Sequence, residues 1–410
     1  MNILMISPAS PPKNSPEAMQ VGRFLQELDK YHTITLATTP IEKGWVMQDS
    51  SLQYDFKNIK ILELKLPFHN KMIRLLSSKY FKFFALPDKD FWIKWKLTYI
   101  LNKVTNKPDV IYSRSMPFSS ALLALRLKRK TKLPWVMHLS DPFIDNPYRK
   151  KSFNEKLLVK YEYECFNEAN YITVTTKNLL KFYQKKYPLF SKKIKLSSNV
   201  MPIKVLNTKI DFNIKIKDKI QIFYAGALYD KRNFTTLLDA LEILKEQKPT
   251  ILTRLDIIIA GNMTDDIKKK ILEKNFKQIT MLGRLNYEKI LEIQDKVDIV
   301  VSIEPDGDNP ILKSFLPSKI LDYLAVKKPI LAITPKGSES WDICNKYNFG
   351  WAIEPNDSKK LAILLENLLL NTNETKNIET DYKLLDKYNI ENCVLKLNKL
   401  FDKSIKKETI

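Results

Sequence analysis

Short apolar runs alternate with amphipathic stretches along most of the chain. In the first half, apolar runs predict strands at NILMIS (2–7), TITLAT (33–38), DVIYSR (109–114), WVMHLS (135–140) and YITVTT (171–176). Helical periodicity predicts helices between them, around 19–28, 119–130 and 154–168. Strands that alternate with helices in this way are typical of parallel sheets covered by helices.

A second series of the same kind follows a polar stretch near 203–219. Its predicted strands are QIFYAG (221–226), LDIIIAG (255–261), QITMLG (278–283), DIVVSI (298–303) and PILAIT (329–334). A chain of 410 residues is comfortable for two domains. We therefore expect two Rossmann-like, doubly wound α/β domains, 1–202 and 203–375, that face each other across a cleft. We expect the C-terminal helical segment, 376–410, to pack back on the first domain.

Three of the eight glycines, Gly226, Gly261 and Gly283, each end a predicted strand of the second half. A glycine at the carboxyl end of a strand lets a ligand approach the backbone closely. In open α/β sheets, ligands bind beyond these carboxyl ends. The chain lacks the G-x-G-x-x-G and GxxxxGK[ST] cradles. The glycines thus predict a ligand site of another kind.

The stretch FLPSKILDYLA (315–325) reads as a helix start that is apolar except for two charges. Pro317 suits the first helical position, and Lys319 and Asp322, three residues apart, share one face of the helix. The positive N-terminus of a helix is a ready site for an anion. The pattern therefore favours a socket for a ligand with a phosphate and a hydroxyl, with a surface ion pair as the alternative.

The net charge of +22 comes from 59 lysines and only nine arginines on the positive side. Lysine suits solvated faces, whereas nucleic-acid recognition favours the planar arginine fork. The chain also lacks a helix-turn-helix, zinc-finger or RNP pattern. We expect no nucleic-acid partner; an anionic membrane surface or acidic small substrates explain the basicity at least as well.

No stretch reaches the ~20 consecutive apolar residues of a membrane span, and MNILMISPAS lacks the basic region that opens a signal peptide. Cys165, Cys344 and Cys393 lie far apart, without metal or redox spacing. They are typical of free thiols in a reducing cytosol. The sequence therefore predicts a cytoplasmic protein without a metal site.

Four stretches in the expected order carry a resemblance to a known family. They are ISPASPPKNSPEAMQVGRF, PWVMHLSDPFIDNPY, YAGALYDKRNFTTLLDAL and FLPSKILDYLAVKKPILAI. With them, nearly the whole chain resembles the family-4 glycosyltransferases of the GT-B fold, in particular those that build bacterial surface polysaccharides. The likeness departs from the family at Ser314 and Asp322, which stand where many members have two glutamates, and at Ala227, where many have an arginine.

The resemblance implies a transfer of a sugar from a UDP- or GDP-linked donor to a glycan or polyprenyl-diphosphate-linked acceptor, as in capsule or O-antigen synthesis. It implies no cofactor and no metal, because cations and helix N-termini stabilise the departing diphosphate in such enzymes; we expect retention of configuration. Two alternatives stay open: a nucleotide-sugar-binding protein with decayed catalysis, and a nucleotide-sugar epimerase of the same fold, against which the count of three histidines argues.

The resemblance also implies donor-binding residues in the second domain. Arg232 and Lys319, with Gly226 and Ser318 beside them, would hold the diphosphate. Asp322 would accept hydrogen bonds from the ribose. The remaining donor contacts, to the base, are expected at Gly283 and Arg284 in MLGRL.

In the first domain, His138 and Asp141 stand at the end of the strand WVMHLS. A histidine can take the proton of an acceptor hydroxyl, and a carboxylate can orient it or act itself, so both are candidate catalytic residues. The alternative is that His138 is a satisfied core residue. Glu17 and Arg23, near the first loop, are weaker candidates for acceptor contacts.

The segment from Leu66 to Trp95 mixes aromatic residues with lysine and arginine and contains only two acidic residues. Such stretches lie well on anionic membranes, which would suit an acceptor on a lipid carrier. We therefore hypothesise peripheral contact with the inner face of the cytoplasmic membrane. The alternative is an ordinary helix and loop that pack beside the cleft.

Overall fold

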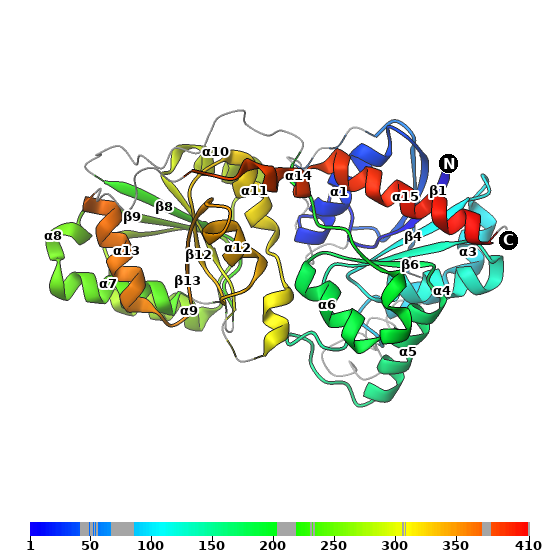
Figure 1. Ribbon diagram of the computed structural model, residues 1–410, viewed down its shortest axis with the longest axis horizontal. Coiled ribbons are helices and arrows are strands. Elements are labelled where there is room, and N and C mark those ends of the chain that lie inside the picture. Colours follow the sequence, from blue (N-terminus) through cyan, green and yellow to red (C-terminus); the bar gives the residue numbers. More distant parts are fainter. Residues whose placement is uncertain are drawn as a thin grey trace. The chain divides into compact units, whose positions relative to one another are not determined.

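The computed structural model describes residues 1–41, 49, 52, 54, 56–66, 86–202, 219–229, 232, 234–305, 307, 309–370 and 379–408 (Figure 1). They form two compact units, residues 1–200 with 389–410, and residues 201–388. The segment 376–410, which the sequence analysis treated as one piece, is therefore divided: its described residues up to 388 belong to the second unit, and its last helix belongs to the first.

The first unit is built on a seven-stranded parallel sheet. Its strands are β1 (Asn2–Ile6), β2 (Thr33–Thr38), β3 (Ile59–Glu63), β4 (Val110–Ser115), β5 (Trp135–Leu139), β6 (Tyr171–Val174) and β7 (Ile194–Leu196). The order across the sheet is β3-β2-β1-β4-β5-β6-β7. The five predicted strands are confirmed, whereas β3 and β7 were missed. Both are edge strands and are short or half-exposed, so neither produces a continuous apolar run.

Helices cover both faces of this sheet. They are α1 (Pro16–Leu28), η1 (Phe91–Trp95), α3 (Leu97–Lys103), α4 (Ser119–Thr131), α5 (Glu155–Glu168), α6 (Lys177–Lys186), η2 (Pro188–Lys193) and α15 (Ile390–Glu408). Alternate side chains of β1 point to opposite faces: Leu4 and Ile6 join the core under α4, and Ile3 and Met5 join the core under α1 and α15. The C-terminal helix α15 contacts α1, β4 and β5 (Figure 1).

The second unit repeats the plan with a six-stranded parallel sheet in the order β10-β9-β8-β11-β12-β13. The strands are β8 (Ile220–Ala225), β9 (Leu255–Ala260), β10 (Ile279–Gly283), β11 (Ile299–Ile303), β12 (Ile330–Ile333) and β13 (Gly350–Ile353). The first five were predicted. The edge strand β13 was missed because it is only four residues long and begins at a glycine.

Helices again lie on both faces of the sheet. They are α7 (Thr235–Gln247), α8 (Pro249–Leu252), α9 (Asp265–Lys274), α10 (Tyr287–Lys296), η3 (Pro310–Ser314), α11 (Ser318–Val326), α12 (Glu339–Asn345), α13 (Ser358–Leu370), η5 (Tyr382–Leu384) and α14 (Leu385–Tyr388). One apolar core lies under α7, α9 and α13, and the other under α10, α11 and α12. The expected two doubly wound domains are confirmed.

In both sheets the first strand of the unit lies between its second and fourth strands. Connections therefore leave toward opposite edges from the pairs β1/β4 and β8/β11. This is the switch point of a doubly wound sheet, where a crevice opens beyond the carboxyl ends of the strands. Each unit thus has one place where the fold itself favours a ligand site.

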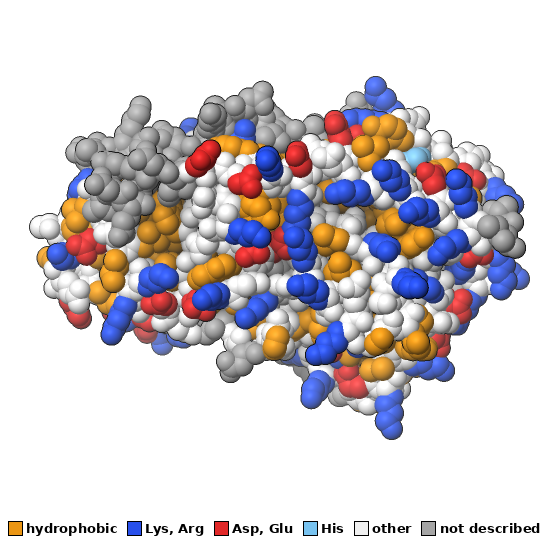
Figure 2. Space-filling model, viewed as in Figure 1, with side chains coloured by type: hydrophobic (Ala, Val, Ile, Leu, Met, Phe, Trp, Pro, Cys, Tyr) orange, Lys and Arg blue, Asp and Glu red, His pale blue; other side chains and the backbone are white. Residues whose placement is uncertain are grey.

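Lys and Arg side chains are spread over the face shown in Figure 2, with Asp and Glu side chains between them, rather than gathered in one patch. None of the described helices combines the length and the apolarity that a membrane crossing requires. The three cysteines are free and buried.

Candidate active site

In the second unit, the end of β8 is shaped around Gly226. This residue has a φ of +147°, a conformation that L side chains rarely adopt. A Cβ atom at this position would collide with Nζ of Lys319. Glycine therefore lets the amine of Lys319 lie directly against the backbone at the switch point.

Lys319 lies in the first turn of α11, one residue after Ser318; Pro317 is the N-cap residue rather than the first helical residue. The residue as a whole is half-buried, but Nζ is shielded from solvent and has no hydrogen-bond partner. It lies 4.0 Å from the centre of the Tyr224 ring. Burial, followed by the charge of Arg232, lowers the pKa of Lys319 well below its usual value. A buried amine without a partner is costly, so this position favours a site that an anion completes.

Arg232 adds a second cation. Its guanidinium lies 5.4 Å from the centre of the Tyr229 ring, and its Nε is buried without a hydrogen-bond partner. The charge of Arg232 acts on Lys319. The structure thus brings Gly226, Arg232 and Lys319 together, as expected for residues that bind a diphosphate.

Asp322 lies one turn further along α11. It is 5% exposed, and its Oδ1 accepts a hydrogen bond of 3.1 Å from the Tyr287 hydroxyl on α10. The alternative that Lys319 and Asp322 form a surface ion pair is therefore wrong, because Asp322 and the Lys319 amine are both buried. Asp322 and Lys319 stay on one face of α11, as the spacing predicts.

The residues expected to bind the base lie at the end of β10, two strands from β8. Gly283 and Arg284 are exposed, and the carbonyl of Gly283 accepts a hydrogen bond of 2.7 Å from the amide of Gly261. A shallow hollow of about 320 Å³ adjoins them. It is lined by Arg284, Leu285, Asn286, Glu288, Lys289 and Glu292.

Glu304, directly after β11, was missed by the sequence analysis. It is 2% exposed, and neither carboxylate oxygen has a hydrogen-bond partner. Burial raises the pKa of Glu304 to about 6, although the nearby hydroxyls and cations oppose that shift. The available signal was a carboxylate that follows the apolar run DIVVSI at the same edge as Gly226.

The corresponding edge of the first unit holds a network centred on Arg114, which lies in β4 and is fully buried. Its Nε donates to Glu17 Oε1 over 2.8 Å, and its Nη2 donates to Asn199 Oδ1 over 3.4 Å. Glu17 Oε2 accepts a hydrogen bond of 2.6 Å from Ser140. Sequence reasoning proposed Glu17 but not its partner, although the charge of Arg114 at the end of an apolar run was a signal.

The other candidates of the first unit lie in different surroundings. Arg23 is 3% exposed and donates to the carbonyl of Val200 over 2.9 Å, which fits a structural role. His138 is fully buried in β5; its Nδ1 lies 2.9 Å from Thr173 Oγ1. Burial, and then the charge of Arg114, lowers the pKa of His138 well below its usual value. This enclosure places His138 in the core, but not as a fully satisfied residue, because its buried Nε2 has no hydrogen-bond partner.

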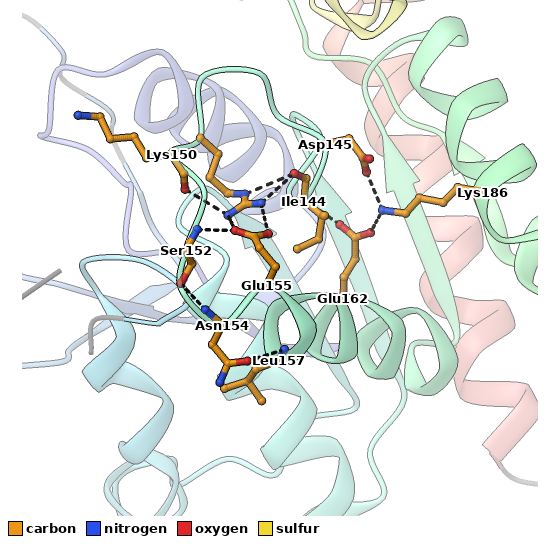
Figure 3. A network of polar contacts seen from close by, with 10 residues as sticks. Ile144, Asp145, Lys150, Ser152, Asn154, Glu155, Leu157, Glu162 and Lys186 are labelled. Atoms are coloured by element: carbon orange, nitrogen blue, oxygen red, sulfur yellow. Dashed lines mark hydrogen bonds and ion pairs between the residues drawn. The ribbon is translucent and has the colours of Figure 1, made fainter. Parts of the chain in front are cut away.

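Asp141 is half-buried in the turn after β5, beside Ser140. The loop that follows is fixed by polar contacts (Figure 3). Arg149 holds both carboxylate oxygens of Glu155, at 2.9 and 2.6 Å, and Lys186 pairs with Asp145 at 2.6 Å and with buried Glu162. These contacts fix the loop that follows Asp141 to α5 and α6, and Asp141 stays the candidate proton acceptor of this unit.

Sequence models of two glycosyltransferase families match the chain. The model described as Glycosyltransferase Family 4 matches residues 62–202, and the model described as Glycosyl transferases group 1 matches residues 207–383. The chain is also 23% identical over 278 residues to the "Probable glycosyltransferase WbjE" of Pseudomonas aeruginosa; the match covers 65% of this chain and 68% of that protein.

Solved structures show the same fold. A structure described as "Trehalose-6-phosphate from E. coli bound with UDP-2-fluoro glucose" has a TM-score of 0.65 and 12% identity, and the match covers 98% of this chain and 99% of that one. A putative UDP-N-acetylglucosamine 2-epimerase from Listeria monocytogenes has a TM-score of 0.58 and 11% identity, over 97% and 94% of the two chains. At such identities the likeness concerns the fold alone, so the sequence models decide between transferase and epimerase.

Proposed function

We propose a donor and an acceptor for this chain, which is a family-4-like glycosyltransferase with the GT-B fold. The donor is a UDP- or GDP-linked sugar, and the acceptor is a glycan or a polyprenyl-diphosphate-linked glycan of a bacterial surface polysaccharide. The surface-polysaccharide role rests on the block PWVMHLSDPFIDNPY and its likeness to members that make such glycans. UDP-2-fluoro glucose in a structure of the same fold makes uracil the first base to test.

The observation that supports the donor most is the buried amine of Lys319 without a hydrogen-bond partner, beside Arg232. Both cations lie at the carboxyl edge of the sheet, where the switch point favours a ligand. A nucleoside diphosphate leaves with negative charge, and fixed cations lower the barrier to its departure. We propose that Lys319, Arg232 and the N-terminus of α11 supply this charge without a metal, in a transfer that retains configuration. Asp322 binds the ribose.

On the acceptor side, we propose Asp141 as the group that takes the proton of the acceptor hydroxyl. The fixed loop supports this role because a proton acceptor must be held in one position. Glu17 is committed to Arg114 and Ser140, so its role is to shape this edge rather than to move a proton.

We also propose peripheral contact with an anionic membrane through the segment 66–95. Residues 67–85 of it lie outside the described residues. Trp95 is 57% exposed, with the Lys94 amine 5.6 Å from its ring centre, and Tyr99 and Leu101 of α3 are exposed nearby in the sequence. Aromatic and basic side chains of this kind suit an anionic interface. Sedimentation with phosphatidylglycerol vesicles tests the contact; binding that is absent, or insensitive to salt, would contradict it.

A thermal-shift screen with UDP, GDP, CDP, TDP and ADP tests the donor proposal. A ligand at ~100 times its dissociation constant stabilises the folded state by ~2.7 kcal/mol. We expect UDP or GDP to stabilise the wild type and not Lys319→Ala. The control is Lys269→Ala, an exposed lysine on α9, which should respond like the wild type. No shift with any nucleotide, or an equal shift in Lys319→Ala, would contradict the proposal. Binding without sugar transfer would favour the decayed-site alternative.

A further inference from the structure

The second unit contains two buried groups of opposite charge that do not pair. Glu304 and Lys319 follow the same strand, β11, at the switch point, and their charges act on each other. Yet no ion pair joins them among the described residues, and neither the carboxylate oxygens nor the amine has a hydrogen-bond partner. An unpartnered buried ion is costly, so the folded chain by itself leaves both groups in an unfavourable environment.

A carboxylate is unexpected in a site that binds a diphosphate, because the two negative charges repel. The hydroxyls of Thr334 and Ser340 lie near it and lower its pKa, but neither makes a hydrogen bond of good geometry with a carboxylate oxygen. Thr334 Oγ1 is hydrogen-bonded to Ser338 Oγ at 2.7 Å, and Ser340 Oγ is itself buried without a partner. Glu304 therefore keeps acceptor capacity on both carboxylate oxygens, which a hydrogen-bond donor from a ligand can satisfy.

A nucleotide sugar has both kinds of group at a short separation. Its diphosphate needs cations, and the sugar attached to the second phosphate carries hydroxyls that donate hydrogen bonds. We propose that Glu304 binds hydroxyl groups of the donor sugar while Lys319 and Arg232 hold the diphosphate. This inference rests on the proposed donor function and assigns the sugar contact within that site.

The assignment also accounts for Ser314, which stands where the family resemblance would place a glutamate. Ser314 is 3% exposed, and its side chain is shorter than that of a glutamate and carries no carboxylate. Glu304, ten residues earlier, supplies an acidic group at the same edge of the sheet. The competing role for Glu304 is a counter-charge that only keeps Lys319 protonated, and this role predicts a different response to mutation.

Isothermal titration at pH 7.5 separates the two roles. The probes are UDP and GDP, together with UDP-glucose, UDP-N-acetylglucosamine, UDP-galactose and GDP-mannose. The proteins are the wild type, Glu304→Gln and the control Glu246→Gln, an exposed position on α7. We expect Glu304→Gln to weaken binding of the preferred sugar nucleotide at least about tenfold, as for a lost hydrogen bond to a charged group. Binding of the free nucleoside diphosphate should change less than about threefold or tighten, because a repulsive charge is removed.

Equal losses for the nucleotide and its sugar conjugate in Glu304→Gln would overturn the sugar contact and favour the counter-charge role. No change in the sugar nucleotides, or no sugar nucleotide bound more tightly than its nucleoside diphosphate by the wild type, would also overturn it. If neither UDP nor GDP binds, the donor proposal itself fails. Circular dichroism spectra and urea unfolding of each variant establish that it is folded.

Discussion

The two switch points of this protein have the same strand order, but the charged side chains are paired at the first and unpaired at the second. In the first unit, buried Arg114 pairs with Glu17, whose side chain is 10% exposed, and Ser140 and Asn199 complete their hydrogen bonds. In the second unit, the amine of Lys319 and the carboxylate of Glu304 are buried apart and without partners. The comparison teaches that one fold can use the same position in two ways. Charges that pair with each other stabilise the unit, whereas unpaired buried charges are able to bind a ligand of opposite charge.

The largest effect is expected from breaking the satisfied pair. Arg114→Met leaves Glu17 without its cation, and removing one partner of a buried ion pair costs about 3–5 kcal/mol. Urea unfolding measures the loss. The matched control is Arg129→Met, whose partners Glu164 and Glu168 lie on the surface, where the loss should stay below about 1 kcal/mol. Equal losses in the two variants would mean that the Arg114–Glu17 pair stabilises the first unit no more than a surface ion pair does.

The unsatisfied site should respond in the opposite way. Lys319→Met removes a buried amine that has no partner, so the free energy of unfolding should stay the same or rise. Sugar transfer, measured as nucleotide release with acceptor present, should fall by about 10²–10³-fold, the usual cost of one electrostatic contact to the leaving group. A variant that loses stability as severely as Arg114→Met would contradict the comparison.

Acid titration compares the two units through His138 and Glu304. The folded state holds the pKa of His138 below the ~6.5 of the unfolded chain, so its contribution to stability is present above that pH and is lost below it. The contribution of Glu304 to stability depends on pH in the opposite direction. Its folded pKa of about 6 lies above its unfolded value, so its contribution is present at low pH and is lost as the pH rises through about 6.

Unfolding free energies between pH 7.5 and 5 test these signs. His138→Asn should flatten the loss of stability on acidification, by up to about 1.4 kcal/mol per pH unit. Glu304→Gln should steepen the loss, because the variant no longer gains stability from proton uptake in the folded state. Identical pH profiles for the wild type and both variants would show that burial shifts the pKa of neither His138 nor Glu304.

The smallest effect is expected at Arg284. Its side chain is exposed at the end of β10, so Arg284→Ala should change the unfolding free energy by less than about 0.5 kcal/mol. We expect binding of UDP or GDP, measured by titration calorimetry, to weaken by no more than about fivefold, because solvent screens the contacts of an exposed guanidinium. A loss of nucleotide binding as great as that in Lys319→Ala would show that the Arg284 side chain itself binds the nucleotide.

Most strands that the sequence predicted lie inside a sheet; the exception is the edge strand β10, which is partly exposed but still apolar in sequence. β1, β4 and β5 lie in the middle of the sheet, so each leaves an uninterrupted apolar run. The edge strands β3, β7 and β13 were missed because half of an edge strand can be polar or the strand can be very short. Gly226 and Lys319 were found because a glycine after a strand and a charge at a helix start each have a local physical meaning.

The sequence by itself determined two doubly wound units, and it predicted that Gly226 and two cations meet at the carboxyl edge of the second sheet. The tertiary structure alone decided which charges are satisfied. Glu17 lies 97 positions from Arg114 along the chain, and they meet because β1 and β4 are neighbours in the sheet. His138 was a candidate base in the sequence and is a core residue in the fold, since β5 is covered on both faces. Periodicity reports how a segment is buried, whereas partnership between distant charges depends on strand order, which no local pattern encodes.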